Sequence, residues 1–288
     1  MRTRTKIIIA IVVLVVISQW LAVRLVYAHK LPVNFSYYIS KIYNLKAGTV
    51  SDQTSAYNIS LATYLDHYRS LEHYLADNED NVDISELAWQ RAVKDHWTET
   101  LSNNYDLAVT EQEIEEYLED AVMMDQDPES FAQFSQETYG LSINKFKELI
   151  IRPYLVEIRV YQYLLDNYND KEGIERAQDA YKALEAGRDF VDVAKEFATD
   201  ATYAENSVWL SDEDLVDFYE PIKELGEGEF SKIVIMPGAY LLWQVDSIVQ
   251  DLESGTTARE ARSIFIQAKG LDQFFQEYLD LADINKTY

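Results

Sequence analysis

Few residues of this chain could carry out acid–base, nucleophilic or metal chemistry, and they are unevenly placed. The four histidines are His29, His67, His73 and His96, and the chain has no cysteine. His67 and His73 are six residues apart on a predicted helix, so they point to different faces, which disfavours a shared metal ion. The sequence lacks an H-E-x-x-H zinc motif, a G-x-S-x-G nucleophile turn and a phosphate-binding loop. It therefore predicts no metal site and no cofactor.

Carboxylates are the abundant ionisable groups. The first 28 residues hold four basic residues and no acidic ones, so the remainder has 25 − 4 = 21 basic against 50 acidic residues, a formal charge of −29. Such a charge disfavours binding to nucleic acid and electrostatic adhesion of this part to anionic lipid. The densest acidic run, Asp77–Asp83, lacks the glycine and terminal glutamate of an EF-hand loop, so we favour a solvated loop over a calcium site.

The N-terminus has the pattern of a membrane-targeting segment. Three basic residues within the first six precede the apolar run Ile7–Val23, which has about the minimum length of a membrane span. The positive end should stay cytoplasmic, which would export the rest of the chain. A cleaved signal peptide is the alternative, since Val26-Tyr27-Ala28 would suit signal peptidase. Because the run is longer than a usual signal core, we favour an uncleaved anchor over residues 1–28 and a single-pass cell-membrane protein.

Helical signals dominate the next part of the chain, up to residue 165. Residues 29–50 are predicted to form a juxtamembrane stalk, with a short strand at 47–50, and residues 57–74 have helical periodicity. N-cap residues predict further helix starts at Asp83, Thr110 and Asp127. Pro153 should kink or split the last helix.

The stretch Gly187–Asp246 has a different and more specific pattern. An apolar stripe at helical spacing precedes it, and Gly187 supplies a left-handed stop. Ser211–Asp214 resembles a capping box that opens a later helix. Two β-rich runs, Lys232–Met236 and Ala239–Val245, are joined by a Pro-Gly pair suited to a type II turn.

This order of motifs resembles the parvulin family of peptidyl-prolyl isomerases, which carries G-x-D-F, then A-x-x-x-S-x-D, then L-x-x-G-E-x-S, then a strand opening G-x-H. The matching residues are Gly187-Arg188-Asp189-Phe190; Ala194, Ala198 (for serine) and Asp200; Leu225 and Gly228-Glu229-Phe230-Ser231; and Gly238-Ala239-Tyr240, with tyrosine for histidine. The resemblance implies a small α/β domain with an antiparallel-rich, four-stranded sheet.

One expected strand is displaced in the sequence. Parvulin domains usually open with a strand reading basic-His-Ile-Leu, and no such strand precedes Ile174. A β-branched and aromatic run comes at the end instead, Ala261–Gln267, where Arg262-Ser263-Ile264 matches with serine for histidine. Our hypothesis is that this late strand pairs beside the strand containing Tyr240, so that the domain is circularly permuted and Ser263 lies near Tyr240. The alternative is an extra edge strand.

The resemblance also implies where a site should lie. Parvulins twist the prolyl amide in a hydrophobic pocket beside two histidines and a Cys or Asp, whereas no histidine follows residue 96 here. The family's paired glycines before the second strand are replaced by Glu205-Asn206. We therefore expect the isomerase chemistry to have lapsed. The degenerate catalytic positions are Asp200, Tyr240 and Ser263, and the candidate peptide-binding residues are Phe230, Trp209, Met236 and Tyr240.

The helical block is similar to the N-terminal chaperone domain of SurA-type and PrsA-type foldases. The residues that carry this likeness are Val109–Ile114 (V-T-x-x-E-I), Phe131–Gly140 (F…Y-G) and Phe146–Leu155 (F-K…I-x-P-x-L). The expected α+β chain comprises an anchor over 1–28, a mostly helical SurA-like chaperone domain over 29–170, a parvulin-like domain over 171–268, and a C-terminal helix over 269–288 that returns to the chaperone domain.

Together the two resemblances imply an extracytoplasmic, membrane-anchored chaperone that binds unfolded or nascent exported polypeptides. The 21 tyrosines and five tryptophans are compatible with this, because these side chains bury large areas at low entropic cost. Two alternatives stay open: a working peptidyl-prolyl isomerase that uses Asp200 and Tyr240 without histidine, and a non-catalytic envelope scaffold that recruits partners.

Overall fold

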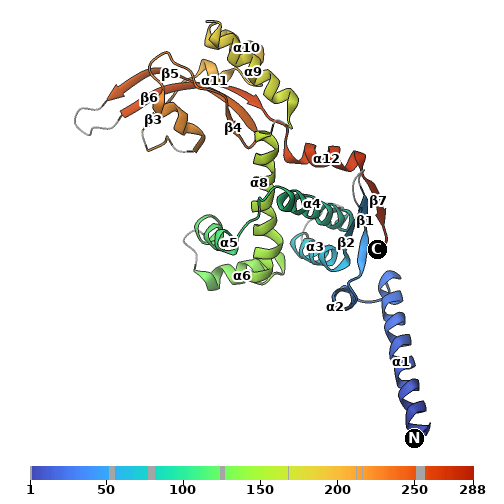
Figure 1. The fold of residues 1–288 in the computed structure, drawn as a ribbon. Coiled ribbons are helices and arrows are strands. Elements are labelled where there is room, and N and C mark those ends of the chain that lie inside the picture. Colours follow the sequence, from blue (N-terminus) through green and yellow to red (C-terminus); the bar gives the residue numbers. More distant parts are fainter. Residues whose placement is uncertain are drawn as a thin grey trace. The chain divides into compact units, whose positions relative to one another are not determined.

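The chain folds into two compact units of mixed α and β structure (Figure 1). The computed structural model describes residues 2–51, 56–76, 82–123, 127–167, 169–211, 213–215, 217–250 and 257–288, with side chains from residue 14 onward except those of 217 and 218. Most of the acidic run Asp77–Asp83, Asp212 of the predicted cap and Tyr168 lie outside these residues. The first unit is Met1–Glu157 with Phe275–Tyr288, and the second is Ile158–Phe274.

The first unit is mainly helical. Its elements are α1 (Arg2–Tyr27), α2 (Val33–Tyr43), α3 (Leu61–Tyr74), α4 (Ile84–Asn104), α5 (Glu111–Tyr117), the π-helical segment η1 (Leu118–Met123), α6 (Pro128–Tyr139), α7 (Ile143–Phe146) and the π-helical segment η2 (Lys147–Ile151). The helix α8 (Arg152–Asp166) begins here and continues into the second unit, so the unit boundary falls within this helix. The boundary expected from the sequence is 170/171.

The predicted helix starts are confirmed by their hydrogen bonds. The Asp83 carboxylate accepts from the Glu86 N–H at 3.1 Å, and Thr110 and Glu113 form a complete capping box. Asp127 accepts from the Ser130 N–H at 3.0 Å. The expected split falls just before Pro153: the π-helical η2 ends at Ile151, and α8 begins at Arg152 with Pro153 as its second residue.

The first unit also contains a three-stranded antiparallel sheet, in the order β2-β1-β7. Its strands are β1 (Lys46–Ser51), β2 (Ala56–Ser60) and β7 (Asp283–Lys286). The prediction of a strand near 47–50 is confirmed, whereas the prediction of helix over 57–60 is wrong because these residues pair with β1. A Cβ on Gly48 would lie 2.5 Å from the Asn285 carbonyl oxygen and 2.6 Å from Trp89, so only glycine lets β7 approach β1 this closely.

The predicted membrane anchor is not confirmed. Among the residues that the structure describes, no helix meets the length and apolarity needed to cross a membrane.

The second unit is built on a four-stranded antiparallel sheet in the order β3-β6-β5-β4. Its further elements are α9 (Lys171–Glu185), α10 (Phe190–Phe197), α11 (Thr202–Glu205), β3 (Val208–Ser211), the 3₁₀ helix η3 (Asp217–Glu224), β4 (Val234–Met236), β5 (Ala239–Gln250) and β6 (Thr257–Gln267). The late strand β6 pairs with β3 on one side and β5 on the other. Its predicted place inside the sheet is therefore confirmed, and the alternative of an edge strand is wrong.

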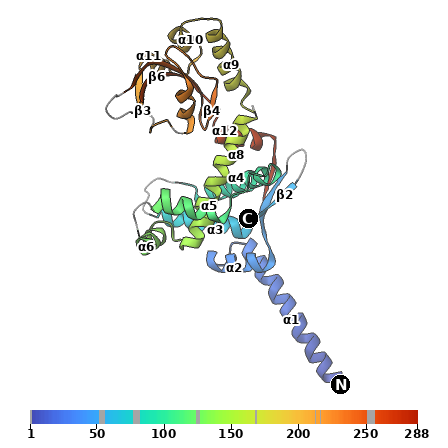
Figure 2. The ribbon, with the colours of Figure 1, turned by 60° about the vertical axis from the view of Figure 1, so that its left-hand side comes forward.

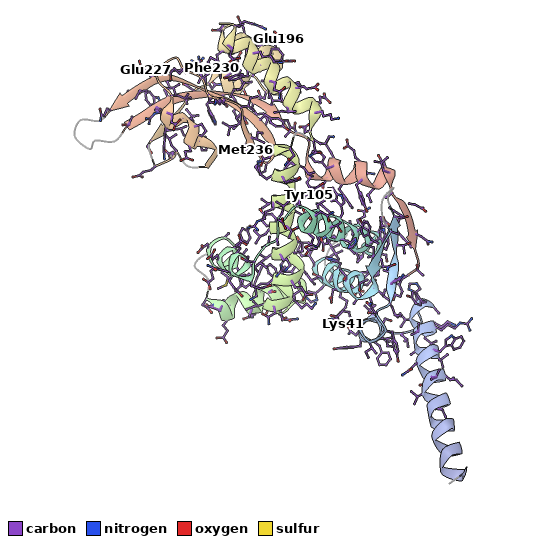
Figure 3. All side chains as sticks on the ribbon, viewed as in Figure 1. Lys41, Tyr105, Glu196, Glu227, Phe230 and Met236 are labelled. Carbon is purple, nitrogen blue, oxygen red and sulfur yellow. The ribbon has the colours of Figure 1, made fainter. Side chains whose placement is uncertain are left out.

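Two local predictions near this sheet have different outcomes. Strands β4 and β5 are joined by the predicted Pro237-Gly238 turn, with Gly238 at φ +93° and Met236 opposite Ala239 (Met236 is labelled in Figure 3). Of the predicted Ser211–Asp214 capping box only half forms: the Asp214 carboxylate accepts from the Ser211 N–H at 2.8 Å, whereas the Asp214 N–H donates to the Ser211 carbonyl instead of its hydroxyl. The helix that follows, however, begins only at Asp217 and is a 3₁₀ helix.

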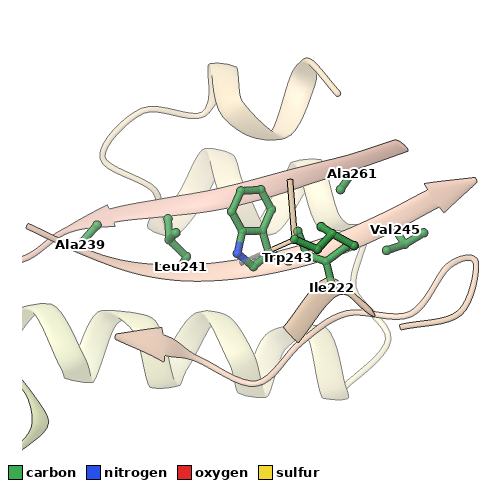
Figure 4. Packing of buried hydrophobic residues seen from close by; sticks show 7 residues of the cluster. Ile222, Ala239, Leu241, Trp243, Val245 and Ala261 are labelled. Atoms are coloured by element: carbon green, nitrogen blue, oxygen red, sulfur yellow. The ribbon is translucent and has the colours of Figure 1, made fainter. Parts of the chain in front are cut away.

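Different elements pack against the two faces of this sheet. The helices α9 and α10 cover one face (Figure 2). On the other face, η3 packs against an apolar cluster whose members on β5 are Ala239, Leu241, Trp243 and Val245 (Figure 4). Because side chains alternate along a strand, Tyr240 between them points to the α9 face, where a Cβ on Gly173 would lie 2.7 Å from its ring.

Candidate functional site

A cavity of about 340 Å³ opens on the sheet face that carries the apolar cluster. Met236 of β4, Leu241 and Trp243 of β5, and Ser263 and Phe265 of β6 contribute sheet side chains to it. Tyr203, Val208 and Tyr219 line it from α11, β3 and η3. Seven of these eight side chains are aromatic or apolar, which is the lining that apolar ligands require.

The register of β5 and β6 explains why these residues meet. Leu241 lies directly opposite Phe265, and Trp243 lies directly opposite Ser263. Two further rings pack on this row: Tyr203 lies 5.4 Å from Phe265 and Tyr219 lies 5.2 Å from Trp243, between ring centroids. Such ring pairs contribute about 0.5–1.5 kcal/mol each beyond their burial, so they hold the walls of the cavity in place.

Two polar side chains of the lining, Arg262 and Asn206, are already bound to protein atoms. The Arg262 guanidinium donates to the Asp246 carboxylate at 2.7 Å and to the Ala204 carbonyl at 3.3 Å. The Asn206 amide donates to the Thr202 carbonyl at 2.9 Å. The charge of Arg262 is therefore balanced by Asp246, and the cavity offers an apolar surface to a ligand.

Asp200 does not line the cavity. Its exposed carboxylate accepts from the Thr202 hydroxyl at 2.7 Å and from the Thr202 N–H at 2.9 Å. These bonds, the hydroxyl first, lower the pKa of Asp200 below its ordinary value. Asp200 therefore caps the turn leading into α11.

Tyr240 lies on the other face of the sheet, and its expected proximity to Ser263 is wrong. In the β5–β6 ladder Tyr240 pairs with Ile266, whereas Ser263 pairs with Trp243. Positions 240 and 243 are an odd number of residues apart on an alternating strand, so their side chains point to opposite faces. Ser263 reaches the cavity and Tyr240 does not.

A buried polar cluster surrounds Tyr240. Asp170 is 3% exposed, caps α9 by accepting from the Gly173 N–H at 3.1 Å, and accepts from the Lys269 N–H at 2.9 Å. Burial, and then the neighbouring Asp170 carboxylate, raise the pKa of Tyr240 above its ordinary value. This phenol is therefore a buried core group between β5 and the start of α9, and does not belong to the cavity.

Two other candidate residues also lie outside the cavity. Trp209 is 53% exposed and pairs with Glu260, and the alternation of β3 turns it away from the face that Val208 and Leu210 share. Phe230 packs edge-to-face on Tyr181 of α9, with 5.8 Å between ring centroids. Of the residues named from the sequence, the cavity lining contains Met236 and Ser263.

The sequence motifs did not indicate five large apolar and aromatic residues of the lining: Tyr203, Tyr219, Leu241, Trp243 and Phe265. The alternation of β5 was a usable signal, but this strand is apolar on both faces, so the pattern did not indicate which set faces the cavity. The pairing of Ser263 with Trp243 determines which set of β5 side chains faces the cavity.

Comparison with known proteins finds no matching family model, no similar curated protein and no similar solved structure. The resemblance to parvulins and to SurA-type foldases therefore rests on the sequence motifs quoted above.

Proposed function

We propose that this protein is a membrane-anchored, extracytoplasmic chaperone that binds unfolded or nascent exported polypeptides. In this proposal its parvulin-like domain binds apolar side chains without catalysing prolyl isomerisation. The observation that supports it best is the composition of the cavity on the four-stranded sheet, which combines aromatic walls with a single charged side chain that is already balanced by Asp246.

Binding without bond chemistry suits the groups present. General acid–base catalysis works best with a group that titrates near the operating pH, and histidine is the usual one. The chain has no histidine after residue 96, and the described lining of the cavity contains no imidazole, carboxylate or thiol. Asp200 is held ionised by Thr202, outside the lining.

A single cavity of this kind should bind weakly. Burying one apolar side chain contributes about 1.5–3 kcal/mol, whereas a Kd of about 1 mM already needs about 4 kcal/mol. An unfolded polypeptide would therefore be held through several weak contacts at once, which also allows its release. This behaviour fits a chaperone better than an enzyme that must position one bond.

We propose further that the parvulin-like domain is circularly permuted and that α1 anchors the chain. The interior position of β6 beside β5 supports the first proposal, because a late strand occupies the place expected for an early one. The second is supported by the basic start, the apolar run and an exposed Trp20 whose ring lies 4.9 Å from the Arg24 guanidinium, an arrangement typical of a membrane interface. A mature chain that began at His29 would contradict it.

The test is suppression of aggregation by the full-length protein. A thermally unfolded client such as citrate synthase should stay soluble at a near-stoichiometric ratio, and Tyr203→Ala should weaken this severalfold because it removes one wall of the cavity. Trp209→Ala is the matched control, since both rings are 53% exposed and only Tyr203 lines the cavity. Equal suppression by both variants would contradict the cavity as the binding site, and no suppression by the wild type would favour a scaffold.

A further inference from the structure

The helix α2 carries an apolar stripe that no described residue covers. Phe35, Tyr38 and Ile42 are 56%, 65% and 73% exposed, and their spacing of three and four residues places them on one face. The opposite face is buried through Ser36, Tyr37 and Ser40, and α2 packs on α3. A surface helix of a soluble protein normally exposes a polar face to water. The exposed apolar stripe of α2 therefore indicates that this face contacts an apolar environment outside the described residues.

The sequence segment that contains this stripe is positively charged, unlike the rest of the chain. Residues 1–51 contain seven basic residues and no acidic ones, which leaves 25 − 7 = 18 basic and 50 acidic residues after them. Three of the seven follow α1 closely and are exposed: Lys30, Lys41 and Lys46. Lys41 lies on α2 itself (Figure 3). The carboxylate beneath α2, on Asp66, is bound by Lys145 at 3.0 Å and so does not offset these charges.

The position of α2 is limited by its short connection to α1. Five residues, 28–32, join the two helices, and they can span at most about 17 Å. The end of α1 is itself fixed to the first unit, where Val26 is fully buried and the Tyr27 hydroxyl donates to the Lys46 carbonyl at 3.0 Å. If α1 crosses a bilayer, α2 must begin within or next to the headgroup layer.

We propose that α2 is an interfacial helix that binds a bilayer containing anionic phospholipid. Phe35, Tyr38 and Ile42 insert at the boundary between headgroups and acyl chains, and Lys30, Lys41 and Lys46 face the lipid phosphates. The inference rests on the proposed anchoring by α1. It replaces the expected juxtamembrane stalk with a helix that holds the first unit against the membrane surface.

The absence of cysteine allows a direct measurement of depth. Single cysteines are introduced into the full-length chain as Tyr38→Cys or Ile42→Cys and spin-labelled, and the protein is reconstituted into phosphatidylcholine nanodiscs with and without phosphatidylglycerol. Leu14→Cys, 70% exposed on α1, reports on the anchor. Tyr105→Cys, 46% exposed at the end of α4, is the control for a label in water (Figure 3). Depth is read from the relative accessibility of each label to oxygen and to a water-soluble nickel complex, and circular dichroism checks folding.

We expect the ratio of oxygen accessibility to nickel accessibility to be severalfold higher for the labels at 38 and 42 than for the label at 105. This ratio should fall at 38 and 42 when phosphatidylglycerol is omitted or when Lys41→Glu is introduced. A label at 14 in the acyl region with labels at 38 and 42 in water would overturn the inference and leave the anchor intact. Labels at 14, 38 and 42 that all lie in water would overturn both the interfacial position of α2 and the anchoring by α1. Dipolar broadening between labels at 38 in detergent would assign the stripe to a second copy of the chain, which also overturns the inference.

Discussion

Ser263 and Tyr240 project from opposite faces of the four-stranded sheet. Ser263 lies opposite Trp243 and lines the cavity, whereas Tyr240 lies opposite Ile266 and is fully buried on the α9 side. Tyr240, which the sequence motif aligns with a catalytic histidine of parvulins, is therefore a core residue. On the cavity face, the neighbours of Ser263 across the ladder are Leu241, Trp243 and Val245, none of which exchanges protons at neutral pH.

The first prediction concerns catalysis. The full-length protein should give no cis–trans isomerisation of a proline peptide above the uncatalysed rate, because the cavity lacks a group that titrates near neutral pH. Asp200→Asn should leave client binding unchanged, since this carboxylate bonds to Thr202 outside the lining. A peptide exchange assay by NMR measures the rate directly. A rate near that of ordinary parvulins that disappears in Asp200→Ala would show that the isomerase chemistry has survived.

The second prediction concerns β6. Truncation after Gln250 should unfold the second unit as a whole, because it removes the strand that pairs with both β3 and β5 and leaves their backbone groups without partners. Hydrogen exchange should lose its protection throughout residues 174–246. Truncation after Ala282 is the matched control, because it removes β7, which belongs to the first unit. If β5 keeps its protection from exchange in the chain truncated after Gln250, the role given to β6 is contradicted.

The third prediction concerns the close approach of α9 to β5. Gly173→Ala should lower the free energy of unfolding by about 1–3 kcal/mol, as overpacking does in a filled core. The new Cβ would lie 2.7 Å from the Tyr240 ring and closer still to the Asp170 carboxylate, and both side chains are buried. Urea titration followed by circular dichroism measures the change. Gly226→Ala is the control, because its Cβ would meet its nearest neighbour at an ordinary 3.4 Å and should change little. Equal midpoints for the two variants would contradict the tight contact.

The fourth prediction concerns alkaline pH. Burial, and then Asp170, raise the pKa of Tyr240, so the folded state favours the neutral phenol. Below the unfolded pKa of about 10 this contribution to stability is fully present. Above it the phenol ionises in the unfolded state alone, so the free energy of unfolding falls by up to about 1.4 kcal/mol per pH unit until the folded pKa is reached. Tyr240→Phe should lack this part of the decline, so the urea midpoint of the wild type should fall relative to that of Tyr240→Phe as the pH rises above about 10. Parallel pH profiles would contradict the assignment.

The sequence by itself determined the features that depend on neighbouring residues. The caps at Asp83, Thr110 and Asp127 each use a hydrogen bond that spans three residues, so residue type and spacing are sufficient to predict them. The Pro237-Gly238 turn is equally local, because its geometry needs only a glycine at positive φ. The late strand was also predicted, since a run that is apolar on both faces indicates an interior position.

Only the tertiary structure decided which residues face the cavity, and which segments form strands through distant partners. Along β5 both faces are apolar, so the choice between Tyr240 and Trp243 depended on the β6 register and on the elements covering each face. Residues 57–60 form a strand through pairing with β1, and β1 in turn holds residues 283–286 from the other end of the chain. These pairings join segments whose own sequences do not specify a partner, because backbone hydrogen bonds between strands are the same for almost every side chain.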